Sequence, residues 1–419
     1  MAVIRPFPGI RPKAELASQV ASLPYDVMNT EEAREEAADK PLSYLHIVKS
    51  EIAFPKGYDA YAPEVYAKAG EKFQNLLQQG AIVQDPKAYL YVYEQEMNGH
   101  VQTGLVAASS VNDYWADVVK KHEFTRPVKE QDRMNHMKAT GIHAGPVFLT
   151  YPDVDEINAI IDPIRTTTPD TNFVSPDGVR HTVWVIRDLA TIEQLVTLFK
   201  EKVPATYIAD GHHRAASAGK VGKAAQEANP NGTGEEPYNY FLSVLFPASR
   251  LQIIDYNRVV TDLNGLSPEV FLLKVKEKFE VELVGKEIFK PTTMREFGMY
   301  LQGQWYKLTA KPGTYPDNDP VNGLDVSIMQ NNLLNPILGI ADPRTDDRID
   351  FVGGIRGLKE LSKRVDSGEM AVAFALYPVT IEQLIRIADS GNVMPPKSTW
   401  FEPKLRSGLI VHQFSAKSY

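Results

Sequence analysis

An Asn-Gly pair at residues 98–99 lies between two segments rich in strand-forming side chains. Residues 89–93 (YLYVY) precede the pair, and residues 103–106 (TGLV) follow it. Asn-Gly accepts the positive φ angles of a tight two-residue turn, so this pattern predicts a β-hairpin. A two-residue turn can join only antiparallel strands. The chain therefore cannot be built around a purely parallel sheet.

Elsewhere the pattern of apolar residues alternates between helical and strand periods. Helices are expected at 64–79, 128–140, about 154–161, 190–201, from 211 to about 227, and 380–389. Strands are expected at 146–151, 182–187, 205–209, 239–246, 251–256 and 371–376. The mixture predicts an α/β or α+β fold with mixed sheets and helices. We expect an N-terminal region (1–85) packed on a core domain (86–261), followed by a C-terminal α/β region (262–419).

Composition excludes several classes of protein. Of 419 residues, 43% are hydrophobic, which is enough to build a core, and the net charge is −8, which argues against a nucleic-acid partner. The chain has no cysteine, so thiolate nucleophiles and cysteine metal sites are excluded. The sequence has no apolar run of about 18 residues, so no membrane span is predicted. The proline-bearing N-terminus does not resemble a signal peptide. We expect a cytoplasmic protein with no membrane partner.

The most informative motif is residues 207–218 (YIADGHHRAASA), where a buried strand is expected to end and a helix to begin. The first turn of a helix has unpaired backbone N–H groups and the positive end of the helix dipole, which together attract anions. Gly211 lets an anion approach the backbone closely, and Arg214 can grip phosphate with a fork of donors. We therefore expect a phosphate site with Asp210 beside it.

His212 and His213 are assigned to the same phosphate- or nucleotide-binding site. Adjacent residues point about 100° apart on a helix and to opposite faces of a strand, so the two imidazoles cannot chelate one metal ion, and no metal site is expected. An alternative needs no ligand at all: Asp210 caps the helix, Gly211 makes the turn, and small side chains allow close packing. The sequence leaves both interpretations open.

A second polar segment precedes the helix expected at 128–140. Either Glu123 or His122 can act there as proton acceptor for a substrate hydroxyl, while Arg126 and Arg133 neutralise charge. The same composition is also typical of a solvated loop and helix start.

The C-terminal region 397–419 has four basic residues and one acidic residue, a net charge of +3. Lys397, Ser398 and Thr399 at its start are candidate phosphate-binding residues, although an ordinary strand with surface lysines would look the same. Asp26 follows Pro24-Tyr25 and is a candidate substrate-binding residue, with a simple turn as the alternative.

Asp-Gly-His-His-Arg at residues 210–214, followed by the small residues 215–218, is similar to the phosphate-binding motif of ParB-type nucleotidases, sulfiredoxin and free-serine kinases. Free-serine kinases match best, because they have the acidic residue and the glycine in the same places. Over its full length the chain resembles a prokaryotic family catalogued as a domain of unknown function. That resemblance is based on residues 23–27, 121–125, 130–133, 256–259 and 396–401 together with the motif.

The resemblance implies a ParB/sulfiredoxin-like core with a strand–Asp-Gly-His-His-Arg–helix phosphate site. It also implies a phosphotransferase acting on a small hydroxylated metabolite, with free serine or phosphoserine as substrate. Asp210, Glu123 and His122 would be catalytic, and Mg²⁺ would arrive with a nucleotide or pyrophosphate donor. The alternative is a nucleotide-binding switch of ParB type without turnover. Sulfiredoxin-like redox chemistry is excluded because it needs cysteine.

Overall fold

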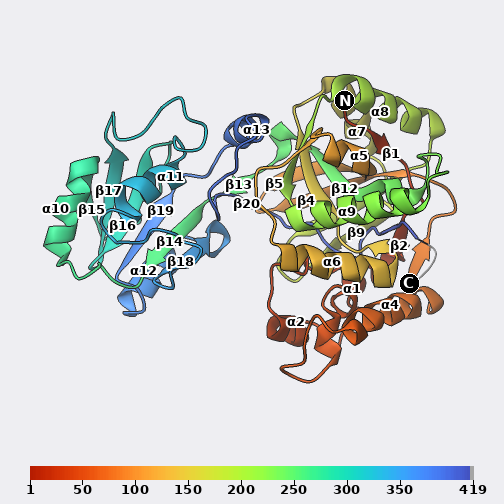
Figure 1. Ribbon diagram of the computed structural model, residues 1–419, viewed down its shortest axis with the longest axis horizontal. Coiled ribbons are helices and arrows are strands. Elements are labelled where there is room, and N and C mark those ends of the chain that lie inside the picture. The colour runs from red at the N-terminus through yellow and green to blue at the C-terminus, as the bar shows by residue number, and fades with distance from the viewer. Residues whose placement is uncertain (416–419) are drawn as a thin grey trace. The chain divides into compact units, whose positions relative to one another are not determined.

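The computed structural model describes residues 1–415, which form two compact units. Unit 1 comprises residues 1–251 together with the C-terminal segment from Pro403 onward, and unit 2 comprises residues 252–402 (Figure 1). The break between the units thus falls before the expected boundary at residues 261–262. The expected N-terminal region, 1–85, is part of unit 1.

Within residues 1–415, unit 1 is built on a nine-stranded sheet in the order β6-β11-β8-β12-β5-β4-β10-β9, with β1 paired to β5. Its strands are β1 (Ile4–Arg5), β4 (Leu90–Met97), β5 (His100–Ser110), β6 (Val119–Lys120), β8 (Val147–Tyr151), β9 (Thr171–Val174), β10 (Arg180–Ile186), β11 (Thr206–Asp210) and β12 (Tyr240–Pro247). β6 runs parallel to β11, and β8 runs parallel to β12, while the other pairs are antiparallel. The mixed α/β class is confirmed.

The expected hairpin joins β4 to β5, with Met97 opposite His100. Asn98 and Gly99 both have positive φ, 52° and 81°, as a two-residue hairpin turn requires. This hairpin lies at the centre of the sheet and fixes the register of its neighbours.

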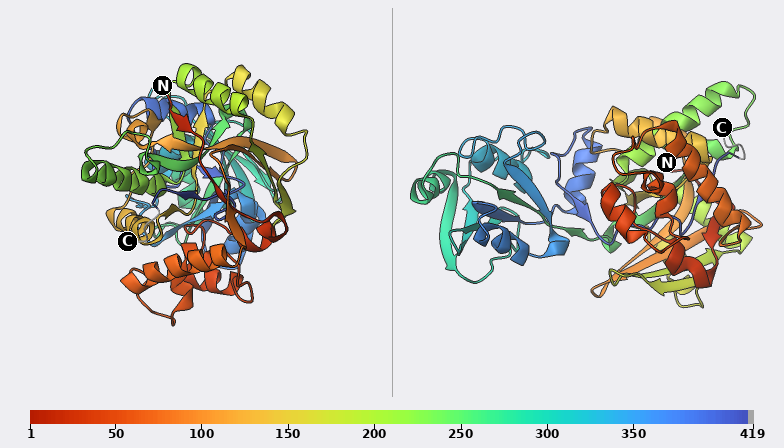
Figure 2. Two further views of the ribbon diagram at one scale, coloured as in Figure 1. Left: turned by 90° about the vertical axis from the view of Figure 1, so that its right-hand side faces the viewer. Right: turned by 90° about the horizontal axis from the view of Figure 1, so that it is seen from below.

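The helices of unit 1 are α1 (Ala17–Val20), α2 (Thr30–Glu36), α3 (Leu45–Val48), α4 (Pro63–Gln78), α5 (Val111–Trp115), α6 (Pro127–Thr140), α7 (Asp155–Ile164), α8 (Leu189–Lys202) and α9 (His212–Ala228). Short 3₁₀ turns lie at η1 (Ala14–Leu16), η2 (Ser50–Ala53), η3 (Pro237–Asn239) and η4 (Ala248–Arg250). α4 packs on α6, and α6 packs on α9 (Figure 1). The left view of Figure 2 shows the N-terminal helices, in orange, as an outer layer of this unit.

Both faces of the central sheet are covered. Side chains from α7, α8 and α9 share a core with Val92, Leu105 and Leu245 on one face. On the other face, Tyr93 and Val244 line a small space together with Leu409 and Ile410 of the C-terminal segment. That segment contains β21 (His412–Gln413), which pairs with β7 (Ile142–His143), and β2 (Ile10–Pro12) pairs with β3 (Ile82–Gln84).

Unit 2 has a six-stranded antiparallel sheet within residues 252–402, in the order β15-β17-β16-β19-β14-β18. Its strands are β14 (Tyr256–Val260), β15 (Phe279–Gly285), β16 (Glu296–Leu301), β17 (Gln304–Ala310), β18 (Ile349–Gly353) and β19 (Val372–Leu376), and β13 (Ile253–Ile254) pairs separately with β20 (Trp400–Phe401). Its helices are α10 (Pro268–Lys278), α11 (Asp325–Met329), η5 (Gln330–Leu334), η6 (Gly354–Arg356), α12 (Lys359–Asp366) and α13 (Ile381–Asp389).

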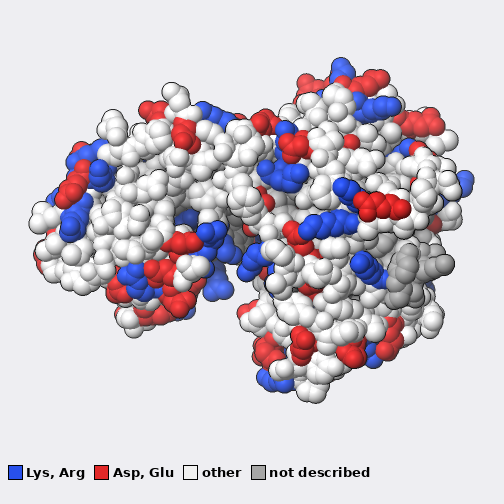
Figure 3. All heavy atoms as spheres, in the orientation of Figure 1, with Lys and Arg blue, Asp and Glu red and all other residues white. Residues whose placement is uncertain are grey.

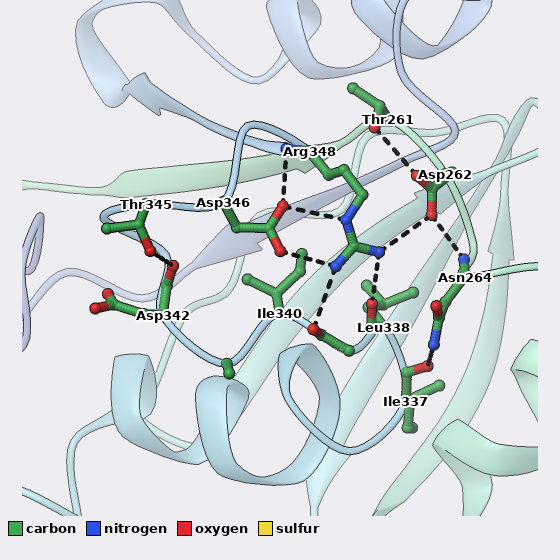
Figure 4. Close-up of polar contacts among 12 residues, drawn as sticks. Thr261, Asp262, Asn264, Ile337, Leu338, Ile340, Asp342, Thr345, Asp346 and Arg348 are labelled. Atoms are coloured by element: carbon green, nitrogen blue, oxygen red, sulfur yellow. Dashed lines mark hydrogen bonds and ion pairs between the residues drawn. The ribbon is translucent and has the colours of Figure 1, made fainter.

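The Asp-rich stretch 340–348 of unit 2 is held by its own arginines. Figure 4 shows the Arg348 guanidinium between Asp346 and Asp262, at 2.8 and 3.5 Å, while it also donates to backbone carbonyls. Asp342 is paired in the same way with Arg344 at 2.7 Å. These carboxylates are therefore engaged as ion-pair partners in a surface turn.

On the face drawn in Figure 3, basic and acidic side chains are interspersed over each unit. No helix among residues 1–415 is long and apolar enough to cross a membrane.

Candidate functional site

The phosphate motif lies where β11 ends and α9 begins. Gly211 occupies the N-cap position with φ 92° and ψ 33°, and no side chain caps the helix. Asp210 is therefore the last residue of the strand, and the alternative in which it caps the helix is wrong. A Cβ at position 211 would lie 2.9 Å from Cζ of Arg214. Only glycine fits this turn, because both the positive φ and the packed guanidinium exclude a side chain.

Arg214 lies inside this turn, with only 6% of its side chain exposed. Its Nη2 lies 2.9 Å from Oδ2 of Asp210 and 3.7 Å from Oδ2 of Asp26, while Nη1 donates to the carbonyl of Pro146. Burial alone lowers the pKa of Arg214, but the two carboxylates outweigh it and raise the pKa. The chain thus brings two expected site residues, Asp26 and Asp210, to one buried cation.

Asp210 is also close to a second cation. Nζ of Lys404, on the C-terminal segment, lies 4.0 Å from Oδ2 of Asp210. Burial raises the pKa of Asp210, but Lys404, Arg214 and His212 oppose it and bring the pKa to about 2. This carboxylate is ionised at neutral pH and is a weak base in the unliganded site.

The two histidines His122 and His212 pack edge to face, with ring centroids 4.5 Å apart. Oε2 of Glu123 lies 3.5 Å from Nδ1 of His212. Burial lowers the pKa of His122 to about 4. Burial also lowers the pKa of His212 well below its usual range, and the neighbouring His122 lowers it further. Both rings are therefore neutral at pH 7. Nδ1 of His122 and Nε2 of His212 are buried and accept or donate no hydrogen bond among the described residues.

His213 points toward the loop before α6. Its Nε2 accepts a hydrogen bond of 3.0 Å from the backbone N–H of Arg126. The side chain of Arg126 is exposed. Nearby, Glu130 pairs with Lys220 and accepts from Thr125, and these contacts outweigh burial and lower the pKa of Glu130. The second polar segment therefore contacts α9 through His213 and Lys220.

Arg133 lies on α6, paired with Asp132 at 2.7 Å and stacked over the ring of Tyr25 at 4.0 Å. Arg133, Arg214, Tyr25 and Ser407 line a small pocket with a cavity volume of about 20 Å³. One expected phosphate-binding residue, Arg214, and one expected substrate-binding residue, Arg133, therefore line the same pocket of unit 1.

The other expected phosphate-binding residues are in the second unit of the chain. Lys397, Ser398 and Thr399 belong to unit 2. Lys404 was expected only as part of the basic C-terminal stretch, and Tyr25 was not an expected site residue, although both lie at the site. Lys404 belongs to the basic C-terminal stretch, and Tyr25 directly precedes Asp26, so charge and adjacency were the only sequence signals for them.

These features define a two-unit mixed α/β protein with an Asp-Gly–helix turn closed over a buried arginine. A family profile matches residues 4–327, and the chain belongs to that family, described as "Protein of unknown function (DUF1015)". This confirms the family expected from the sequence. No curated protein matches the chain.

Several solved structures are similar to the chain. A free serine kinase in complex with AMP is 13% identical, with 71% of this chain and 86% of that chain covered and a TM-score of 0.33. A conserved hypothetical protein from Pyrococcus furiosus is 15% identical, with 73% and 93% covered and a TM-score of 0.33. SbnI with a C-terminal truncation, from Staphylococcus aureus, is 10% identical, with 71% and 82% covered and a TM-score of 0.30. At these TM-scores no property of those proteins carries over to this chain.

Proposed function

We propose that unit 1 is a phosphotransferase that moves a phosphoryl group to or from the hydroxyl of a small metabolite, with free serine or phosphoserine as the substrate. The observation that supports this is the turn at Gly211. It combines a helix N-terminus with a buried arginine and two carboxylates, Asp26 and Asp210. Phosphoryl transfer needs this combination of anion binding, charge neutralisation and a proton acceptor.

Backbone N–H groups in the first turn of α9 are the proposed phosphate donors. They have no partner within the helix, and Gly211 has no side chain to cover them. Arg214 is engaged by Asp210 and Asp26, so its proposed role is to neutralise charge and hold the turn, with His212 and His213 beside the bound phosphate. The substrate carboxylate is assigned to the guanidinium of Arg133, with the exposed Arg126 as a second donor.

In the proposed step the substrate hydroxyl oxygen attacks phosphorus, and a new O–P bond forms. The bond from phosphorus to the donor oxygen breaks, and its electron pair stays on that leaving oxygen. The hydroxyl proton passes to the carboxylate of Asp210 or Glu123, with neutral His122 next to them. Because such transition states are loose, the proton leaves late and a weak base is sufficient.

The donor is proposed to be a nucleotide or pyrophosphate with Mg²⁺. Among residues 1–415 no group of three or more His, Asp or Glu side chains is placed to hold a metal ion. Mg²⁺ that arrives with phosphates keeps several waters and needs only one or two protein carboxylates. Asp26 and Asp210 are the carboxylates we assign to it, and the ion would screen the phosphate charge.

The test is direct. The full chain is incubated with Mg²⁺, L-serine and one donor at a time (ATP, ADP, CTP or pyrophosphate), and O-phosphoserine is measured by mass spectrometry. Release of serine from O-phosphoserine is measured in parallel. Product is expected with at least one donor. Glu123→Gln should lower turnover more than serine binding, whereas Glu193→Gln, an exposed residue on α8, should change neither.

Other outcomes change the proposal. If other small alcohols are phosphorylated but serine is not, serine is rejected as the substrate and the phosphotransferase activity is still supported. Nucleotide binding without turnover of any hydroxyl compound contradicts the phosphotransferase and favours the ParB-type switch.

A further inference from the structure

Unit 2 contains a buried arginine that the proposed function does not use. Arg258 lies in the middle of β14, opposite Phe351 of β18 and Phe374 of β19, and it is only 4% exposed. Its neighbours along the strand, Asn257 and Val259, point to the other face of the sheet, because side chains alternate along a strand. Val259 packs there against Leu361 of α12. Arg258 thus occupies the face opposite α12.

The charge of Arg258 is not matched by an acid. Nη1 donates to the carbonyl of Tyr256, and Nη2 donates to the carbonyl of Lys397 at 3.0 Å. Among the described residues no carboxylate forms an ion pair with it, and burial lowers its pKa to about 10, against the opposing effect of Tyr256. Arg214, equally buried, has two carboxylates. A buried unpaired charge is costly, so a partner for Arg258 is expected.

The loop that covers Arg258 brings a second cation. Lys397 has φ 58°, an uncommon value for a residue other than glycine, and this turns its carbonyl toward the guanidinium. The hydroxyl of Ser398 donates to the carbonyl of Pro395 at 2.6 Å and fixes the turn. Nζ of Lys397 lies 5.6 Å from the ring centroid of Tyr256, and Lys397 is exposed to solvent. The two cations are therefore on the same side of the sheet.

Acidic residues next to these segments are occupied elsewhere. Oδ2 of Asp255 accepts from the amide of Asn257, and Oε1 of Glu402 accepts from the indole of Trp400. Among residues 1–415, Arg258 donates two of its five N–H groups to carbonyls, and its guanidinium lies 5.3 Å from the ring centroid of Phe351. The site therefore has spare donors and two positive charges.

We propose that Arg258 and Lys397, with the neighbouring hydroxyl of Thr399, bind the phosphate group of a small phosphorylated ligand in unit 2. Two cations match a dianionic phosphate better than a singly charged carboxylate, and a guanidinium fork fits two phosphate oxygens. This site is built from residues of unit 2 and does not depend on the function proposed for unit 1.

The probe is radiolabelled inorganic phosphate, measured by equilibrium dialysis against the full-length chain. Lys397→Gln should weaken one class of phosphate sites by about tenfold or more, because a charge-assisted contact is lost. Lys363→Gln is the matched control, since Lys363 is an exposed lysine of the same unit, on α12 at the other face of the sheet. Arg258→Lys keeps the charge and loses the fork, so it should weaken the same class.

Arg214→Lys separates the two sites, because it alters only unit 1. A class of sites that is sensitive to Lys397→Gln and insensitive to Arg214→Lys supports the unit 2 site even if unit 1 proves to have no phosphotransferase activity. Phosphate binding that is unchanged in Lys397→Gln overturns the proposal, whether or not Arg258→Lys folds. Binding of citrate or acetate with no phosphate binding also overturns it and identifies a carboxylate site.

Discussion

At the scale of single residues, the key contact is the one between Arg214 and the carboxylates of Asp26 and Asp210. Replacing Arg214 by Ala removes a buried cation from the partly exposed Asp210 and the exposed Asp26, so we expect a loss of about 1–3 kcal/mol in the free energy of unfolding. Arg214→Lys should recover part of this, because the charge remains and the fork is lost. Urea unfolding of both variants measures the effect, with the exposed Arg187→Ala as control. Equal stability of all three would contradict the assigned role.

Asp210→Asn tests the same contact through pH. The pKa of Asp210 is about 2 in the folded chain, against an ordinary value of 3.8. A carboxylate with a lowered pKa stabilises the fold above its unfolded pKa, and this contribution is lost as pH falls from about 4 to about 2. Asp210→Asn should therefore be less stable than wild type at pH 7, and the difference should shrink across that window. A pH-independent difference in urea midpoints would argue against an ionised Asp210.

The sequence predicted this cluster only where its members are close together in the chain. Asp210, Gly211 and Arg214 lie within one turn, so the local pattern revealed them. Lys404 reaches Asp210 from nearly 200 residues away, and its sequence signal was a basic stretch that gave no partner. Contacts of this kind depend on the tertiary fold, which residue spacing does not encode.

At the scale of elements, the junction between β11 and α9 depends on a single glycine. Gly211→Ala places a Cβ against the Arg214 guanidinium in addition to the cost of a positive φ. Gly178 has a similar φ, 81°, with no atom within 4 Å of the added Cβ, so Gly178→Ala isolates the backbone cost of about 1 kcal/mol. We expect Gly211→Ala to be clearly more destabilising in chemical unfolding. Equal losses for the two variants would show that the guanidinium can move aside.

The bounds of a strand were predictable where its whole apolar segment pairs with the same neighbouring strand. The hairpin of β4 and β5 is such a case. Residues 251–256 were expected to form a single strand, but the structure splits this stretch between β13 and β14. Ile253 and Ile254 pair with β20, whereas Tyr256 begins a strand of the six-stranded sheet. A continuous apolar run does not show where its pairing partner changes.

At the scale of the whole molecule, buried histidines make stability dependent on pH. His143 and His412 contact each other through Nδ1 atoms 3.0 Å apart, joining β7 to β21. Burial lowers the pKa of His412 to about 3, and burial together with His412 lowers that of His143 well below 6.5. Below pH 6.5 the unfolded chain binds protons that the folded chain does not, so stability falls as pH decreases.

Each such histidine should cost about 2 kcal/mol between pH 6.5 and pH 5, from about 1.4 kcal/mol per pH unit. Thermal unfolding measured over this range should show a falling melting temperature. The double substitution His143→Phe, His412→Phe removes two of the titrating groups and should make the decrease shallower. An unchanged slope in the double variant would show that this pair is protonated in the folded chain.

The return of residues 403–415 to unit 1 has a consequence for how the protein is made. These residues supply Lys404 to Asp210 and β21 to β7, yet they leave the ribosome only after all of unit 2 has been synthesised. Unit 1 therefore cannot complete its sheet face or its site during the translation of its own first 251 residues. Unit 2 is contiguous in the chain, so its whole sequence is available for folding before β21 can pair with β7 of unit 1.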